Sequence, residues 1–237
     1  MILSVPISLA RMRRDLQKAD LARRLFHKGR KLLNCGVSAR ERKAGFRLIR
    51  EAADLGHGTA HSWLGAAYDY GLGTRPNRPL AFTHYLRAAK LGDVNGEYHV
   101  GAFYYEGRGT SRNDRLAVRW LRRAMNHGDA TAAYVLGACY RYGRGVQRDA
   151  RKAFQLQLTA ATKGELGAQF AVAVCYRSGD GVAADPREAF RWFLLAARRG
   201  HRDAAHNLAV LYSKGVGTSR SARRAKLWRR RAELPAA

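Results

Sequence analysis

The sequence predicts an all-α fold, an α/α superhelical solenoid built from 36-residue helix–turn–helix repeats. Tyrosines and paired glycines recur at this spacing in five successive copies. The tyrosines are Tyr68, Tyr104, Tyr140, Tyr176 and Tyr212, and the glycine pairs are Gly71/Gly73, Gly107/Gly109, Gly143/Gly145, Gly179/Gly181 and Gly215/Gly217. Such a period is typical of a stacked array, in which each helix pair buries its apolar face against its neighbours.

Each repeat is expected to contain two helices joined by the paired glycines. The first helix carries an apolar-small pair such as Leu136-Gly137, followed by Tyr140. The second helix begins after a residue type that accepts hydrogen bonds from free N–H groups, and it stops at a glycine suited to a left-handed C-terminal cap. The starting residues are Asn77, Asn113, Asp149, Asp185 and Ser221, and the stops are Gly56, Gly92, Gly128, Gly164 and Gly200.

Both ends of the array are expected to be atypical, because a terminal repeat exposes one face to water. We expect an N-terminal extension over residues 1–20 and a degenerate repeat over 21–56, in which Cys35 and Val37 replace the glycine pair. Five repeats follow over 57–92, 93–128, 129–164, 165–200 and 201–237. In the last one Arg229, Arg230 and Arg231 replace Phe193, Leu194 and Leu195 of the preceding copy. This polar capping helix predicts a monomer rather than an end-to-end dimer.

The repeated phrase resembles the Sel-1-like repeat family, a variant of the tetratricopeptide repeat. The matching residues are Leu136-Gly137 and Tyr140, Gly143-x-Gly145-Val146, Asp149 with Lys152-Ala153, and Ala196-Ala197 with Gly200. The similarity covers residues 40–233. It implies an α/α scaffold that binds proteins or peptides, without naming a partner.

The cysteines favour a reducing compartment, so we expect a cytoplasmic protein. Cys139 and Cys175 occupy the same position of adjacent repeats, where helix axes roughly 8–10 Å apart disfavour a disulfide and favour small core residues. The short apolar start, Met1–Ala10, precedes its arginines, so no signal peptide is expected, although a start site placed too late would hide a targeting segment. No stretch has the length of a membrane span.

First helices line the concave face of helical-hairpin arrays, so we predict a partner-binding groove there. If Leu136 and Tyr140 face the core, helical spacing turns Tyr134, Arg141 and Tyr142 toward the groove. With their equivalents, the predicted groove residues are Tyr98, Tyr134, Phe170, His206, Tyr105, Arg141, Tyr142, Arg177 and Lys214. Aromatic anchors with a few charges suit a protein or peptide, and the basic side of the groove suits an acidic one. The alternative is that the aromatic residues pack between neighbouring first helices.

The charge gives a second hypothesis, a basic protein that binds nucleic acid. Lysine and arginine number 44 against 18 acidic residues, a formal net charge of +26. The arginines gather on second helices and their leading turns, on the convex face, where they could hold phosphate backbones. The candidates are Arg112, Arg115, Arg119, Arg122, Arg123, Arg223, Arg224, Arg229, Arg230 and Arg231. A solvated basic face without a ligand is the alternative.

The sequence predicts no enzyme, cofactor or metal site. His57 and His61 have helical ligand spacing, but no third ligand accompanies them. The Gly-x-Gly turns lack the strand and the lysine of a nucleotide-binding loop. We therefore favour a non-enzymatic adaptor over catalysis.

Overall fold

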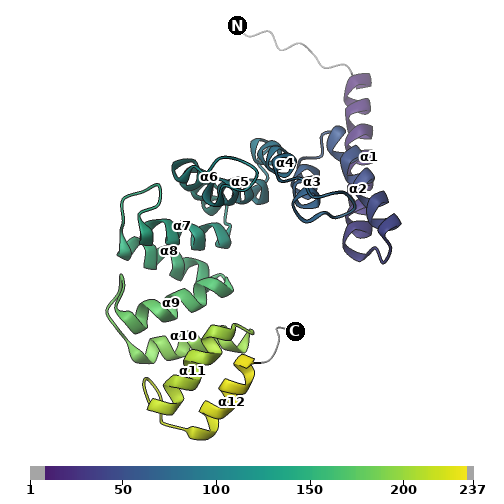
Figure 1. Ribbon diagram of the computed structural model, residues 1–237. Coiled ribbons are helices and arrows are strands. Elements are labelled where there is room, and N and C mark those ends of the chain that lie inside the picture. The colour runs from purple at the N-terminus through teal and green to yellow at the C-terminus, as the bar shows by residue number, and fades with distance from the viewer. Residues whose placement is uncertain (1–8, 234–237) are drawn as a thin grey trace. The chain divides into compact units, whose positions relative to one another are not determined.

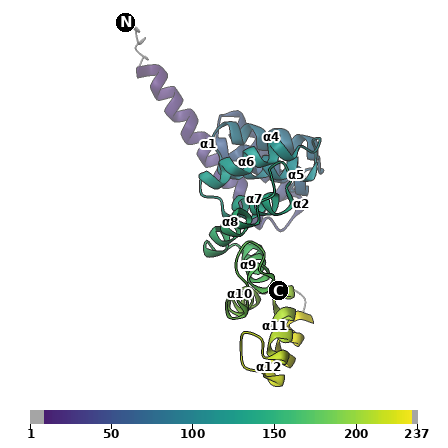
Figure 2. The same ribbon diagram turned by 90° about the vertical axis from the view of Figure 1, so that its left-hand side faces the viewer.

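The computed structural model describes residues 9–233, which form twelve helices and thus an all-α fold (Figures 1 and 2). The helices are α1 (Leu9–Cys35), α2 (Ala39–Asp54), α3 (Gly58–Tyr70), α4 (Arg78–Lys90), α5 (Val94–Glu106), α6 (Asp114–Asn126), α7 (Ala130–Tyr142), α8 (Ala150–Thr162), α9 (Leu166–Ser178), α10 (Pro186–Arg198), α11 (Arg202–Lys214) and α12 (Ala222–Glu233). They pack as consecutive helix pairs, the α/α repeat solenoid that the 36-residue period predicts. The chain forms two compact units, Met1–Asn113 and Asp114–Ala237.

The polar residues predicted to start the second helices do cap them. Oxygens of Asn77, Asp149, Asp185 and Ser221 accept hydrogen bonds from backbone N–H groups in the first turn, at distances of 3.1, 2.9, 3.1 and 3.3 Å respectively. Each cap satisfies one of the donors that a helix start leaves unpaired. The predicted stop glycines adopt the left-handed backbone, with φ between 84° and 97°.

The two glycines of each turn have different roles. The first is the left-handed C-terminal cap of the first helix, as at Gly143, where φ is 68° and the N–H bonds to the Cys139 carbonyl. The second lies directly on the N-terminus of the preceding repeat's second helix. A Cβ on Gly145 would collide with the Asp114 carbonyl, and one on Gly181 would collide with that of Ala150. The second glycine therefore allows close contact between neighbouring repeats.

The degenerate N-terminal repeat is stabilised by contacts that the other repeats do not use. Helix α1 begins at Leu9, so much of the stretch expected to precede the repeats is helical. Gly29 of α1 and Gly45 of α2 pack backbone to backbone, because a Cβ on either would lie within 2.9 Å of the other helix. A reciprocal capping box between Ser38 and Glu41 starts α2 where the glycine turn is missing. The apolar start, where no signal peptide is expected, lies largely outside the described residues. No helix within residues 9–233 has both the length and the apolar character to cross a membrane.

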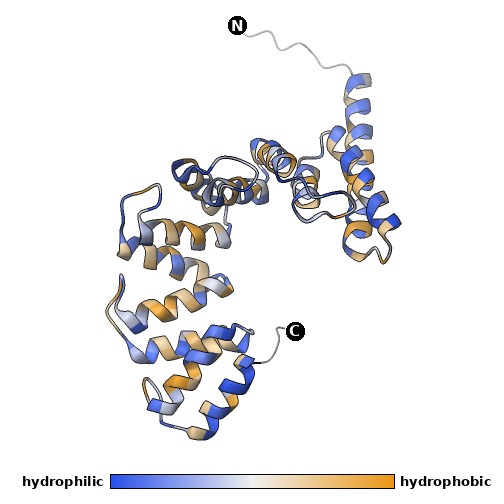
Figure 3. Ribbon diagram, viewed as in Figure 1, coloured by the Kyte–Doolittle hydropathy of each residue, from blue (hydrophilic) through white to orange (hydrophobic). Residues whose placement is uncertain are grey.

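Small residues bring the helices of a pair together, as the sequence predicts. The Tyr85 ring of α4 lies over Gly65 of α3, and Gln157 of α8 lies over Gly137 of α7. In the second unit, Phe193 and Leu208 are fully buried in the core shared by α9 to α12. Figure 3 shows α9 and α11 largely orange and α12 largely blue. Helix α12 buries only Ala225 and Trp228, which agrees with a polar cap on the array.

Both repeat-register cysteines are core residues. Cys139 is 0% exposed and Cys175 is 2% exposed, whereas Cys35 is exposed at the end of α1. Burial raises the pKa of the Cys139 thiol to about 11, which keeps it protonated at neutral pH. These two thiols therefore serve packing rather than chemistry.

Candidate functional site

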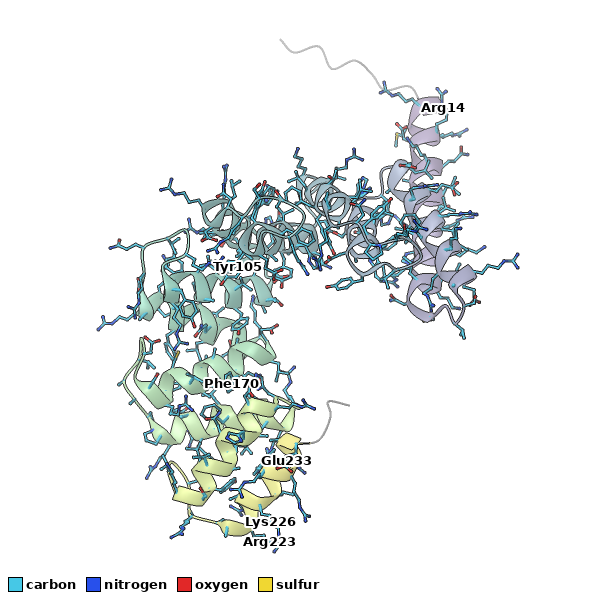
Figure 4. The ribbon with its side chains drawn as sticks, viewed as in Figure 1. Arg14, Tyr105, Phe170, Arg223, Lys226 and Glu233 are labelled. Carbon is cyan, nitrogen blue, oxygen red and sulfur yellow. The ribbon has the colours of Figure 1, made fainter. Side chains whose placement is uncertain are left out.

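The first helices of the second unit, α7, α9 and α11, are joined in a row near their N-termini. The Tyr134 ring of α7 lies against Gly167 in the first turn of α9. Phe170 of α9 stacks on His201, the N-cap of α11, with ring centroids 4.4 Å apart and an interplanar angle of 13° (Figure 4). Both aromatic residues are half-buried. Tyr134 and Phe170, which were predicted as groove residues, therefore pack between neighbouring first helices and connect the repeats.

The same row is joined near the C-termini of these helices by polar contacts. Arg141 of α7 forms an ion pair with Asp180, which follows α9, at 2.9 Å. Arg177 of α9 donates a hydrogen bond to the Asn207 Oδ1 of α11. Arg141 is therefore paired with a carboxylate, whereas Arg177 is held by a neutral partner. Asp180 was missed by the sequence reasoning, although it lies 39 residues after Arg141, the spacing that also separates Asp69 from Arg108.

Three predicted groove residues of the second unit remain exposed. Tyr142, the last residue of α7, is 67% exposed, and Lys214 is the last residue of α11, in the same register. Val210 and His206 are exposed one and two turns before Lys214, respectively, and Val210 is 39% exposed. We call Tyr142, Arg177, His206, Val210 and Lys214 the first-helix face. It offers two apolar anchors beside basic groups.

In the first unit, the predicted groove residues Tyr98 and Tyr105 lie on α5, and both are half-buried. Ser62 occupies the register of Tyr98 on α3, and its hydroxyl donates to the Asp93 Oδ1 at 2.6 Å. Asp93 is the N-cap of α5, so this contact again joins one first helix to the start of the next.

The arginines proposed for phosphate binding lie on exposed faces of second helices. Arg115, Arg119, Arg122 and Arg123 line a hollow beside α6, and Arg223, Arg224 and Arg230 line another beside α12, on which Figure 4 labels Arg223. The remaining candidates Arg112, Arg229 and Arg231 are also exposed. The hollows have volumes of about 720 and 860 Å³.

Three histidines of the first unit are half-buried and pack against other rings. His61 pairs with His84, not with His57, and their Nδ1 atoms lie 3.2 Å apart between α3 and α4. Burial, reinforced by His61, lowers the pKa of His84 to about 4. Burial also lowers the pKa of His99 to about 4, where its ring stacks on Tyr85 with centroids 4.2 Å apart. Among residues 9–233, no three His, Cys, Asp or Glu side chains cluster as metal ligands would.

The repeat geometry matches a known family. The family model described as Sel1 repeat matches six consecutive stretches, residues 19–57, 59–93, 94–129, 130–165, 167–201 and 202–232. The chain belongs to the Sel1 repeat family. A search of curated protein sequences gives no significant match.

Solved Sel1 repeat structures share the fold. A Sel1 repeat protein from Oxalobacter formigenes is 27% identical over 98% of this chain and 90% of its own, with a TM-score of 0.80. A protective antigen of uropathogenic Escherichia coli strains with an SLR fold is 22% identical, with a TM-score of 0.82. The alignment covers 96% of this chain but only 48% of the antigen. An immunity protein from Pseudomonas aeruginosa is 22% identical over 90% of this chain and 80% of its own, with a TM-score of 0.60.

Proposed function

We propose that this Sel1 repeat protein is a non-enzymatic scaffold that binds a protein or peptide partner on the first-helix face of its second unit. The observation that carries the proposal is the exposure of Tyr142, 67%, on a row of helices that Phe170 and Arg141 lock together. A fixed aromatic anchor costs little conformational entropy when it is buried at an interface.

The charges of this face indicate the chemistry of the partner. The exposed residues Arg177, His206 and Lys214 lie on the same row of first helices as the apolar side chains of Tyr142 and Val210. A segment with one or two apolar anchors flanked by carboxylates complements this arrangement. Membership of a scaffold family that often binds proteins supports the same class of function.

The test compares captured proteins between two matched variants. Tagged wild type, a face variant (Tyr142→Ser with Lys214→Glu) and a control variant (Leu195→Ser with Arg198→Glu) would each be incubated with nuclease-treated native lysate. Leu195 and Arg198 are exposed on α10, outside the first-helix face, and the control makes the same change in charge. We expect a discrete protein to be retained by wild type and control but lost by the face variant.

A synthetic peptide from the captured protein then gives the affinity. Its dissociation constant should rise at least tenfold in the face variant, equivalent to about 1.4 kcal/mol. Equal capture by all three proteins would refute the proposed binding face.

A further inference from the structure

A basic hollow of about 720 Å³ lies between α6 and the turn that joins α7 to α8. Arg115, Arg119, Arg122 and Arg123 form one wall, and the turn at Gly145 forms another. The arginines follow helical spacing, so they share one face of α6. Among the described residues that line the hollow, none carries a carboxylate. Its volume falls within the roughly 300–1,000 Å³ of typical ligand sites.

The acid closest in sequence to these arginines is itself paired with another residue. The one acid in the first turn of α6, Asp114, pairs with Arg144 at 2.9 Å. Arg122 donates a hydrogen bond to the Tyr140 hydroxyl at 3.1 Å, and the Arg123 guanidinium lies 5.5 Å from the Trp120 ring centroid. Both of these contacts are with neutral groups, and they orient the two guanidinium groups. An oriented guanidinium group is suited to anion recognition.

The same arrangement recurs 72 residues earlier in the first unit. Lys43, Arg47 and Arg50 of α2 stand in the register of Arg115, Arg119 and Arg122, and with the turn at Gly73 they line a hollow of about 690 Å³. The intervening helix α4 carries Pro79, Thr83 and Leu86 at these positions. The basic hollow is therefore a property of particular repeats, not of every second helix.

We infer that the α6 hollow binds the phosphate backbone of a nucleic-acid strand. Arg115 and Arg122 are separated by about 10 Å along the helix axis, so they can contact separate phosphates. Guanidinium groups bind phosphate oxygens with paired hydrogen bonds. This site shares no residue with the first-helix face and does not depend on the proposed scaffold function.

The experiment measures binding of a fluorescent oligothymidine of about 20 nucleotides, longer than the roughly 4–16 that one single-strand site covers. Arg115 and Arg119 are exposed and form no ion pair among the described residues, so Arg115→Gln with Arg119→Gln should leave the fold intact. Full-length variant protein should bind the strand at least tenfold more weakly at low salt. Because two phosphate contacts are lost, the slope of log K against log salt should become less negative by about 1.4.

A matched variant distinguishes binding at the α6 hollow from general electrostatic attraction. Arg151→Gln with Arg198→Gln removes the same charge, and Arg151 has the register of Arg115 one repeat later, but neither residue lines the α6 hollow. We expect less than a twofold change in this variant. Equal weakening by both variants would overturn the inference. So would displacement of the strand by polyglutamate as readily as by inorganic polyphosphate at equal charge, since the hollow would then not select phosphate.

Discussion

The ring of Phe170 stacks on the imidazole of His201, 31 residues later, with ring centroids 4.4 Å apart. Four repeats earlier, Phe26 stacks in the same way on His57, with centroids 4.3 Å apart. Between these two pairs, Ser62 donates a hydrogen bond to Asp93 across the same spacing. In these three first helices the same position thus contacts the N-cap of the next first helix, and either aromatic stacking or a hydrogen bond can make the contact.

Replacing Phe170 with alanine should destabilise the second unit. Phe170 also contacts Phe193 edge to face, with centroids 5.7 Å apart, so the change removes two aromatic contacts and leaves a cavity. We expect a loss of about 2–3 kcal/mol in the free energy of unfolding, below the value for a fully buried phenylalanine. Urea denaturation followed by circular dichroism measures it. Tyr142→Ala, on the exposed ring, should cost about 0.5 kcal/mol or less. Similar losses in the two variants would contradict the assigned role of Phe170.

Alanine at Gly145 should cost far more than alanine at Gly143. Both glycines have positive φ, 70° and 68°, so each substitution introduces the same backbone strain of about 1–2 kcal/mol. Only at Gly145 does the new Cβ collide with a backbone carbonyl, that of Asp114; at Gly143 the nearest atom is 3.5 Å away. We expect Gly145→Ala to add at least about 2 kcal/mol to the strain. Thermal melts of the two variants give the comparison, and equal melting temperatures would exclude a close-contact role.

Two equivalent positions between neighbouring repeats carry an ion pair between an aspartate and an arginine. The two residues have exchanged places between the two pairs, so the pairs have opposite polarity. In the first unit Arg108 lies 3.3 Å from Asp69, whose side chain is 2% exposed; in the second, Arg141 and Asp180 are 22% and 28% exposed. Arg108→Ala leaves a buried carboxylate without this partner and should cost about 2–4 kcal/mol. Arg141→Ala should cost about 0.5–1 kcal/mol, because water can solvate Asp180. The urea midpoints of both variants show which substitution costs more stability. A larger loss of stability for Arg141→Ala than for Arg108→Ala would contradict the interpretation.

Buried histidines make the first unit sensitive to acid. Burial lowers the pKa of His84 and His99 from 6.5 to about 4, so between these values the unfolded chain binds protons that the folded chain does not. The free energy of unfolding is therefore at its full value above pH 6.5 and decreases as the pH falls toward 4.

His99→Phe should weaken this acid sensitivity while retaining a ring against Tyr85. We expect the urea midpoint of wild type to be lower at pH 5 than at pH 7, and the difference to be smaller in His99→Phe. His206→Gln, which removes an exposed histidine of the second unit, should behave as wild type. An unchanged difference in His99→Phe would mean that other groups dominate the acid response.

Much of the fold could be predicted because it depends on local chemistry. Asp149 caps a helix, Gly164 ends it and Gly137 admits a neighbouring side chain, and each effect needs only a few residues of context. It was harder to predict which residues are exposed on the surface, because contacts between repeats depend on how one helix pair is rotated against the next. A small rotation of their helices would expose Tyr134 and Phe170 to solvent. Their packing against Gly167 and His201 instead keeps both rings half-buried.

No local sequence pattern indicates which arginines form ion pairs. Arg141 and Tyr142 are neighbours with the same predicted role, yet Arg141 is paired with Asp180 while Tyr142 is exposed. A search for opposite charges at a fixed offset, here 39 residues, could have identified the pair. The hollow beside α6 also requires the turn of the next repeat, which a helical projection of one helix does not include.

The opposite polarity of the two ion pairs also bears on how the gene can change. Because the repeats have equal length, a deletion of whole 36-residue units would preserve the helical register. A deletion of 72 residues between Asp69 and Asp180 would set these two carboxylates at the junction where each now faces an arginine. Their repulsion would destabilise the shortened protein, so the opposite polarity of the two pairs disfavours the loss of the two intervening repeats.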